Sequence, residues 1–297
     1  MMYRALLLTG LMTIGAAGQN TDPKKDPDQI GNRDVSKGVN FYSIPKELAL
    51  GKQLADQVKR QAPMVKDPII AELVNRVGQN LARNSDSKIP VNIAVIESNE
   101  INSLTLPGGY IFVFTGLLRT AATESELAGA MAHEIAHVAA RHGTRQATQN
   151  QIINLSSIPL IFMGGWAGYG ARQASPLGDH LLAQGFSREF ESEADMLGLQ
   201  YLYKTGYDPG GMIDIFEKIE AHEAGNPNVF QRIASSHPPT GDRLTAVQKD
   251  IQEHLKAQPE YVVSTSDFAK MKARLAALDE ERKAKLKQAP SLYRKLS

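Results

Sequence analysis

Apolar residues recur at helical spacing in two segments of the N-terminal third of the chain. Residues 45–61 read PKELALGKQLADQVKRQ, and residues 68–83 read PIIAELVNRVGQNLAR. Each segment begins with proline, which suits the first turn of a helix because the N–H that proline lacks has no partner there. Both segments are therefore predicted to be amphipathic helices.

Two short runs of β-branched and aromatic residues follow, at 91–98 (VNIAVIES) and 109–116 (GYIFVFTG). Turn residues bound both runs, which predicts two β-strands. Between them LPGG, at 106–109, indicates a hairpin-like turn. A small β-sheet is thus expected before the next helix.

A third helix is predicted from Thr123 to Gly143. The Thr123 hydroxyl can cap its start, with Glu126 three residues on, and glycine commonly ends a helix. Its apolar stripe consists of Leu127, Met131, Ile135 and Val138. His133 and His137 point almost the opposite way, among alanine and glycine neighbours, so the helix is expected to be buried on both sides.

A fourth helix is predicted at 186–202 (FSREFESEADMLGLQYL), with Ser187 as its N-terminal cap. Its apolar stripe consists of Phe190, Ala194, Leu197 and Tyr201. Gly198 is expected to let this helix approach the histidine-bearing helix closely. The last segment, 266–288, is predicted to be a charged amphipathic helix that is capped by Ser266 and is either packed on the domain or partly solvated.

The pattern also divides the chain. Residues 1–18 include an apolar run, shorter than the roughly 20 residues that span a membrane, and are expected to be a cleaved signal peptide. An uncleaved short anchor is the alternative. Polar residues dominate 19–40, which predicts a flexible linker. A folded domain is expected at 41–255 and a C-terminal extension at 256–297. The interrupted run at 152–170 predicts a loop or helical hairpin over the cleft, in which Trp166 could contact a membrane or substrate.

Charge and cysteine content exclude several kinds of partner and site. The chain has 33 Lys and Arg against 32 Asp and Glu, so no overall field would recruit nucleic acid, and no nucleic-acid partner is expected. It has no cysteine, which excludes disulfides, thiolate ligands and a cysteine nucleophile. Any metal site must therefore use histidine and carboxylate ligands.

His133 and His137 lie four residues apart, with Glu134 beside the first, in the pattern HExxH. On a helix, both imidazoles can reach one Zn²⁺, and the adjacent glutamate can take a proton from water at the metal. Two buried histidines satisfied by hydrogen bonds would be the alternative. Zinc is favoured, provided that a third ligand exists. His142 lies off this face and is expected to be a cation at the C-terminal end of the helix.

The third ligand is expected on the 186–202 helix, where Glu189, Glu191 and Glu193 compete. Glu191 alone is followed one turn later by an aspartate, Asp195. Zinc sites use a second carboxylate in this way, to accept the outer N–H of a ligand histidine. Glu191 is therefore predicted to bind zinc and Asp195 to support it, while Glu189 and Glu193 are expected to be solvated surface charges.

HExxH followed by ExxAD, at 191–195, resembles the gluzincin peptidases and in particular metallopeptidase family forty-eight. The resemblance extends over about 39–250. Its other segments are NFYSIPKELALGKQLA, VKDPIIAELVNRVGQNLA, the strand pair NSLTLPGGYIFVFTGLL and SSHPPTGDR. It implies an α+β fold, a mainly helical zincin-like metalloprotease domain with a small β-sheet bordering the active-site cleft. It also implies one Zn²⁺ per chain.

The chain is most similar to the secreted bacterial branch of the family, rather than to its prenyl-protein proteases with many membrane spans. This resemblance implies a periplasmic endopeptidase that cleaves misfolded or unassembled envelope proteins, in peripheral contact with the membrane or with outer-membrane assembly. The strand within 109–115 would be the sheet edge that pairs with substrate. A chaperone or assembly factor with a regulatory zinc site is the alternative function. The oligomeric state is not predicted.

His237, in SSHPPTGDR, generates a separate prediction. Local sequence alone indicates a surface-loop histidine, but the family carries a His-Pro pair close to the active site, with an arginine following as Arg243 does here. We expect His237 to lie beside the zinc ligands and to close the fourth metal position at rest. His237→Ala should then raise basal hydrolysis of an unfolded substrate. A loss of roughly 10²- to 10³-fold with zinc retained would instead assign His237 to oxyanion stabilisation.

Overall fold

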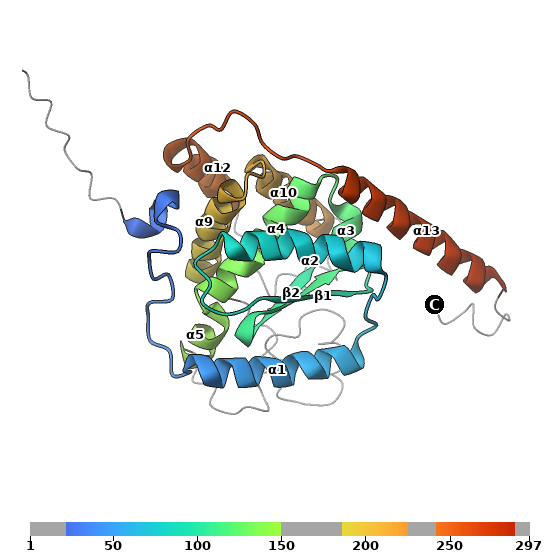
Figure 1. Cartoon of the computed structure of the whole chain (residues 1–297), viewed down its shortest axis with the longest axis horizontal. Coiled ribbons are helices and arrows are strands. Elements are labelled where there is room, and N and C mark those ends of the chain that lie inside the picture. Colours follow the sequence, from blue (N-terminus) through green and yellow to red (C-terminus); the bar gives the residue numbers. More distant parts are fainter. Residues whose placement is uncertain (1–21, 150–185, 225–241, 289–297) are drawn as a thin grey trace, which may run out of the picture.

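A three-stranded mixed sheet lies among the helices, near the centre of the structure (Figure 1). The computed structural model describes residues 22–149, 186–224 and 242–288. The strands are β1 (Asn92–Ile96), β2 (Ser103–Leu106) and β3 (Tyr110–Phe114). Their order is β1-β3-β2, and β3 pairs parallel with β1 and antiparallel with β2. Both strands predicted from the sequence are therefore confirmed.

The predicted turn at LPGG is confirmed as a short 3-10 segment, Pro107–Gly109. Gly108 and Gly109 have φ values of 75° and 81°, which glycine adopts without steric cost. The turn joins β3 to β2, as the resemblance implied, and not to the strand predicted at 91–98. Because β1 pairs with the other side of β3, the expectation that β3 is a free sheet edge is wrong. In the part of the chain that the structure describes, no strand pairs with the outer side of β2.

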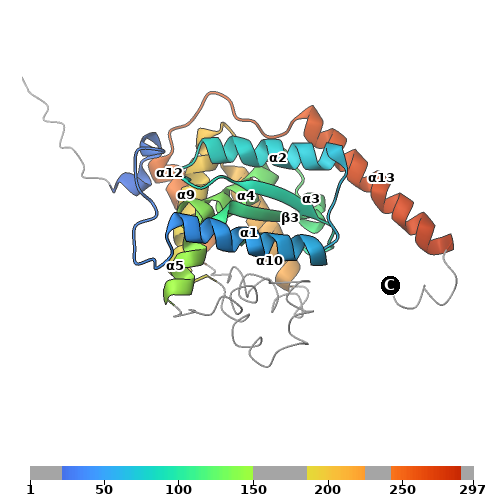
Figure 2. The same ribbon diagram turned by 60° about the horizontal axis from the view of Figure 1, so that its bottom comes forward.

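Helices cover both faces of the sheet (Figure 2). Residues of β3 alternate between them, since Phe112 and Phe114 pack with α1 whereas Ile111 and Val113 pack with α2 and α4. These helices are α1 (Ile44–Gln61), α2 (Pro68–Arg83) and α4 (Glu124–Ala139). The other helices are α3 (Thr115–Thr120), α5 (His142–Gln149), α9 (Arg188–Lys204), α10 (Gly210–Ala224), α12 (Arg243–His254) and α13 (Ser266–Gln288). The α+β fold is confirmed.

Helix α4 is buried along its whole length, as expected from its alanines. The Thr123 hydroxyl accepts the Glu126 N–H, so the predicted cap is confirmed. The predicted end at Gly143 is wrong because the chain leaves the helix after Ala139. Arg141 has a φ of 56°, in the left-handed region, and donates to the Glu47 carboxylate at 2.7 Å. This ion pair stabilises a turn that usually contains glycine, and α5 begins directly after it.

The closest approach of α4 and α9 occurs at Gly198. A β-carbon at this position would lie 2.9 Å from the backbone nitrogen of His133 and 3.0 Å from the carbonyl oxygen of Ala132. Real β-carbons almost never come so near to backbone atoms, so only glycine fits here. The predicted packing role of Gly198 is confirmed, as is the predicted cap, since Ser187 accepts the Phe190 N–H.

The N-terminal segment from Asp22 onward lies against the domain. Arg33 is buried and pairs with Asp86 at 2.9 Å, and Asp86 also accepts the Tyr201 hydroxyl of α9 at 2.8 Å. Lys24 pairs with Glu193 of α9 at 2.5 Å. A buried charge is tolerated only with such partners. These contacts correct the expectation of a flexible linker at 19–40 where the structure describes it; the other domain limits stay predictions.

Helix α13 packs on α2 and α3 through Phe268, Met271 and Leu275, as expected. Its N-terminal cap is Thr265, whose hydroxyl accepts the Phe268 N–H, and not Ser266. None of the helices described is both long and apolar enough to cross a membrane. The expected signal peptide and the segment 152–170, with Trp166, lie outside the described residues.

Gly198→Ala tests the contact between α4 and α9. Overpacking at a buried site costs about 1–3 kcal/mol, of which the better helix propensity of alanine offsets at most about 1 kcal/mol. Urea unfolding should therefore show a less stable protein. Ser192→Ala, at an exposed position of the same helix, is the control and should be neutral or slightly stabilising. Equal stability of the two variants would contradict the close contact.

Candidate metal centre

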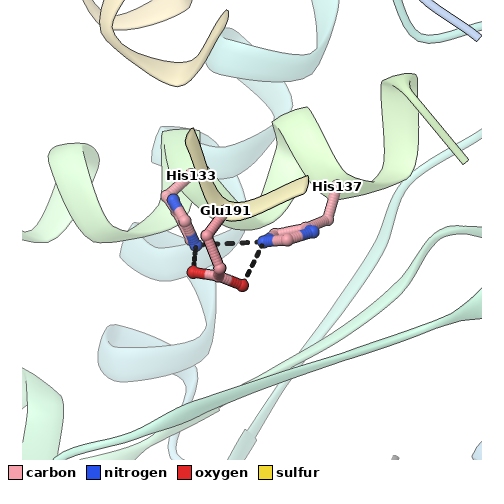
Figure 3. Close-up of side chains that lie close together, drawn as sticks. All are labelled: His133, His137 and Glu191. Carbon is pink, nitrogen blue, oxygen red and sulfur yellow. Dashed lines mark hydrogen bonds and ion pairs between the residues drawn. The ribbon is translucent and has the colours of Figure 1, made fainter. Parts of the chain in front are cut away.

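Three buried side chains converge between α4 and α9. His133 and His137 project from α4, and Glu191 meets them from α9 (Figure 3). Their candidate ligand atoms all lie within 4.8 Å of one another. Among the described residues, these three side chains form the group of histidines and carboxylates that could hold a metal ion. The helical spacing of four puts the two rings on one face, and the contact at Gly198 brings the carboxylate to them.

The distances between these atoms suit a small tetrahedral cation. The two Nε2 atoms are 3.0 Å apart, and the Glu191 carboxylate oxygens lie 3.5 Å from that of His133 and 3.4 Å from that of His137. Zinc bonds of about 2.0–2.1 Å in a regular tetrahedron would separate the ligands by about 3.3–3.4 Å. Two imidazoles and one carboxylate are also a common ligand set for a catalytic zinc. These three residues could therefore hold Zn²⁺.

Glu134 points from α4 to strand β2. Its two carboxylate oxygens accept hydrogen bonds from the Ser103 hydroxyl at 2.7 Å and the Thr105 hydroxyl at 2.5 Å. Ser103 and Thr105 lie on the same face of β2 because side chains alternate along a strand. The hydroxyls orient the carboxylate, and a carboxylate with two such bonds keeps further lone pairs for a proton. Ser103 and Thr105 were not among the residues predicted from the sequence, although S-x-T directly before LPGG shows the alternation.

Asp195 lies where a supporting carboxylate was expected. Its Oδ1 is 2.8 Å from Nδ1 of His133, the ring nitrogen that faces away from the convergence point. Arg243, the first residue of α12, binds Asp195 through two bonds of 2.6 and 2.7 Å and lies 3.1 Å from Glu191. One guanidinium thus holds both carboxylates, a bidentate geometry that lysine could not provide. From the sequence, only the family resemblance indicated that Arg243 lies near the site.

The buried groups titrate as this arrangement predicts. Burial raises the pKa of Asp195, but the charge of Arg243 and its hydrogen bonds lower it below the usual range. Burial also opposes protonation of His133, yet hydrogen bonds with Asp195 and Glu191 raise its pKa to about 9. The carboxylates thus favour positive charge at this ring. Burial lowers the pKa of His137 to about 3, so this ring is neutral at physiological pH, the form that binds a metal.

His142 and Glu193 differ from their expected roles. His142 is not a cation at a helix end: it is fully buried in α5, and burial lowers its pKa. Its Nδ1 lies 2.9 Å from Nδ1 of His137. Glu193 is not a solvated charge, because its carboxylate is largely buried and pairs with His142, Arg145 and Lys24. Burial would raise the pKa of Glu193, but its bonds with His142 and Lys24 lower it to about 2. Glu189 is exposed, as expected.

Aromatic rings enclose the histidines. Phe186 stacks on His137 with ring centroids 4.1 Å apart, and Phe190 stacks on His142 at 4.5 Å. Phe216 of α10 meets the edge of His133 at 5.7 Å. These contacts fix the ring planes and exclude water from the outer sides of the site. His237 lies outside the described residues, so its placement beside the ligands stays a prediction.

Comparison with known proteins agrees with this geometry. The model of Peptidase family M48 matches residues 68–251. The β-barrel assembly-enhancing proteases of Escherichia coli (strain K12) and Yersinia pestis are 31% and 30% identical over 92% and 91% of the chain. The chain spans only 58% and 56% of their respective lengths. The metalloprotease YcaL of Escherichia coli (strain K12) is 28% identical, over 74% of the chain and 87% of its own length.

The matched segment contains the two helices that carry the convergent side chains as well as the sheet beside them. It begins at the first residue of α2 and extends into α12. More than half of the 297 residues lie within it. The chain therefore belongs to peptidase family M48.

Proposed function

We propose that this chain is a zinc-dependent endopeptidase. His133, His137 and Glu191 would hold the ion, and Glu134 would act as the general base. A zinc ion supplies a Lewis acid that polarises a peptide carbonyl and makes water more acidic. The ligand distances and the donor types support zinc, and the family supports the hydrolytic activity. The observation that carries the proposal is the position of Glu134, because a structural metal site requires no carboxylate beside its ligands.

Glu134 would take a proton from the attacking water and return it to the leaving amine. Ser103 and Thr105 would serve this role by holding the carboxylate at β2, the proposed substrate edge. The same two hydrogen bonds connect Glu134 to β2. A substrate that pairs with this strand would therefore lie beside the base. Asp195 and Arg243 would keep the outer nitrogen of His133 bonded, which fixes the ring and raises its basicity as a ligand.

Strand β2 is the candidate substrate edge. It borders α4, and its outer side is not paired with another strand in the described ranges. An extended polypeptide could add to such an edge through backbone hydrogen bonds, without a fixed sequence of side chains. This mode of binding favours unfolded chains and loops over compact domains. It replaces the edge at 109–115 that the sequence analysis expected.

The substrates that we propose are misfolded or unassembled proteins of the bacterial cell envelope. Two relatives are named for enhancing β-barrel assembly, which supports clients of this kind for the chain. The expected signal peptide at residues 1–18 supports export to the periplasm. The names of the two relatives support, in addition, a peripheral contact with the membrane or with outer-membrane assembly. Hydrolysis of casein, with and without a metal chelator, would distinguish this activity from holding of clients without cleavage.

Two glutamates at the start of α9, Glu191 and Glu189, test the metal assignment. Glu191→Ala should lower zinc from one ion per chain, because it removes the only carboxylate that faces both histidines in the described ranges. Glu189→Ala, at an exposed position, is the matched control and should keep full stoichiometry. Elemental analysis after dialysis measures both. Equal zinc loss in the two variants would contradict the assignment of Glu191.

Glu134→Gln separates chemistry from folding. The change is nearly isosteric and keeps an oxygen that can accept from Ser103 or Thr105, so zinc content and thermal stability should be retained. Hydrolysis should fall by roughly 10²- to 10⁴-fold, the contribution typical of a general base. Casein turnover and melting temperature measure the two effects. Turnover near the wild-type value would remove Glu134 as the base.

A further inference from the structure

A chain of polar groups leads from His137 away from the three convergent side chains. Nδ1 of His137 lies 2.9 Å from Nδ1 of His142, and Nε2 of His142 lies 3.1 Å from a carboxylate oxygen of Glu193. Both rings are fully buried. The members come from the end of α4, from α5 and from α9, so three helices meet along the chain.

The hydrogen-bond geometry fixes where each proton lies. Nε2 of His137 points to Glu191 and His133, so it must be without a proton when it binds a metal. The proton of this neutral ring then sits on Nδ1 and is donated to Nδ1 of His142. His142 must therefore carry its own proton on Nε2, where the carboxylate of Glu193 accepts it. An ionised carboxylate can only accept hydrogen bonds, so Glu193 determines the direction of every hydrogen bond in this chain of polar groups.

Glu193 is itself held at both oxygens. One accepts from Lys24 at 2.5 Å, and the other lies 3.2 Å from Arg145 in addition to its contact with His142. Two cations therefore compensate the buried carboxylate and keep it charged. The stacking of Phe190 fixes the plane of the His142 ring, so its nitrogens cannot turn away.

We propose that His142 and Glu193 are positioning residues that hold His137 in the orientation and tautomer that bind the metal. The inference rests on the proposed zinc site. Both histidine ligands would then be held through the ring nitrogen that faces away from the metal: His137 by His142, and His133 by Asp195. Lys24 extends the support to the N-terminal segment, which thereby becomes part of the metal site.

A purely structural ion pair would behave differently from a positioning pair. If Glu193 only joined α9 to α5 and the N-terminal segment, its removal would lower the melting temperature of the metal-free protein without changing its affinity for zinc. A positioning role requires a weaker affinity in protein that is still folded. Zinc affinity and the site of protonation on His142 therefore distinguish the two.

The test measures the Kd for zinc by competition with a chromophoric chelator, in the full chain. Glu193→Ala should raise the Kd about 10- to 100-fold, as loss of an outer partner of a histidine ligand usually does. Glu193→Gln should raise it less, because the amide oxygen still accepts from His142. Glu189→Ala is the matched control on the same helix and should leave the Kd unchanged. His142→Phe, which preserves the stack on Phe190, should match Glu193→Ala.

The tautomer of His142 is a second readout, which a change in protein stability alone would not alter. In zinc-loaded wild-type protein labelled with ¹⁵N-histidine, His142, assigned by the loss of its signals in His142→Phe, should carry its proton on Nε2. A proton on Nδ1, or a Kd for folded Glu193→Ala equal to that of Glu189→Ala, would overturn the inference while leaving the zinc site intact. Wild-type protein that binds no zinc would overturn the proposed function, and this inference with it.

Discussion

The contact between α4 and α9 at Gly198 is the constraint on which the site depends. Without a side chain at this position, the backbone of α9 reaches that of α4 at His133 itself. Glu191 lies two turns before Gly198 on the same helix, so the contact sets how far its carboxylate extends toward the histidines. A longer separation would leave three buried polar groups apart from one another, each at a cost of about 1–3 kcal/mol. The packing of α4 against α9 therefore determines the geometry of the three candidate ligands.

Burial of these groups imposes a second requirement, because each charge needs a compensating partner. Arg243 supplies the positive charge for Asp195 and Glu191, and Arg145 and Lys24 supply it for Glu193. These cations come from elements far apart in sequence. The N-terminal segment and α12 are thus tied to α9 by electrostatics as well as by packing, and the folded domain includes chain that composition alone assigned to a linker. Buried pairs of this kind are costly to break on one side only.

The sequence predicted the parts of the site that follow from local spacing. HExxH and the Glu191–Asp195 turn place side chains on helix faces, and helix periodicity is set within a few residues. Strand β2 was missed by the pattern because it has only four residues, and the pairing of β3 with β1 depends on tertiary packing. Local sequence indicates a helix-end cation at His142, because nothing local shows that Arg141 adopts a left-handed conformation. Glu193 looked solvated because its partners, Lys24 and His142, are distant in sequence.

In the proposed zinc site, α4 contributes two imidazole ligands and α9 one carboxylate ligand. X-ray absorption at the zinc edge of the purified, zinc-loaded protein measures this coordination. We predict a coordination of four light atoms at about 2.0–2.1 Å, with multiple scattering from two imidazole rings, or from three where His237 closes the fourth position. A six-coordinate shell of oxygen atoms without imidazole scattering would contradict it.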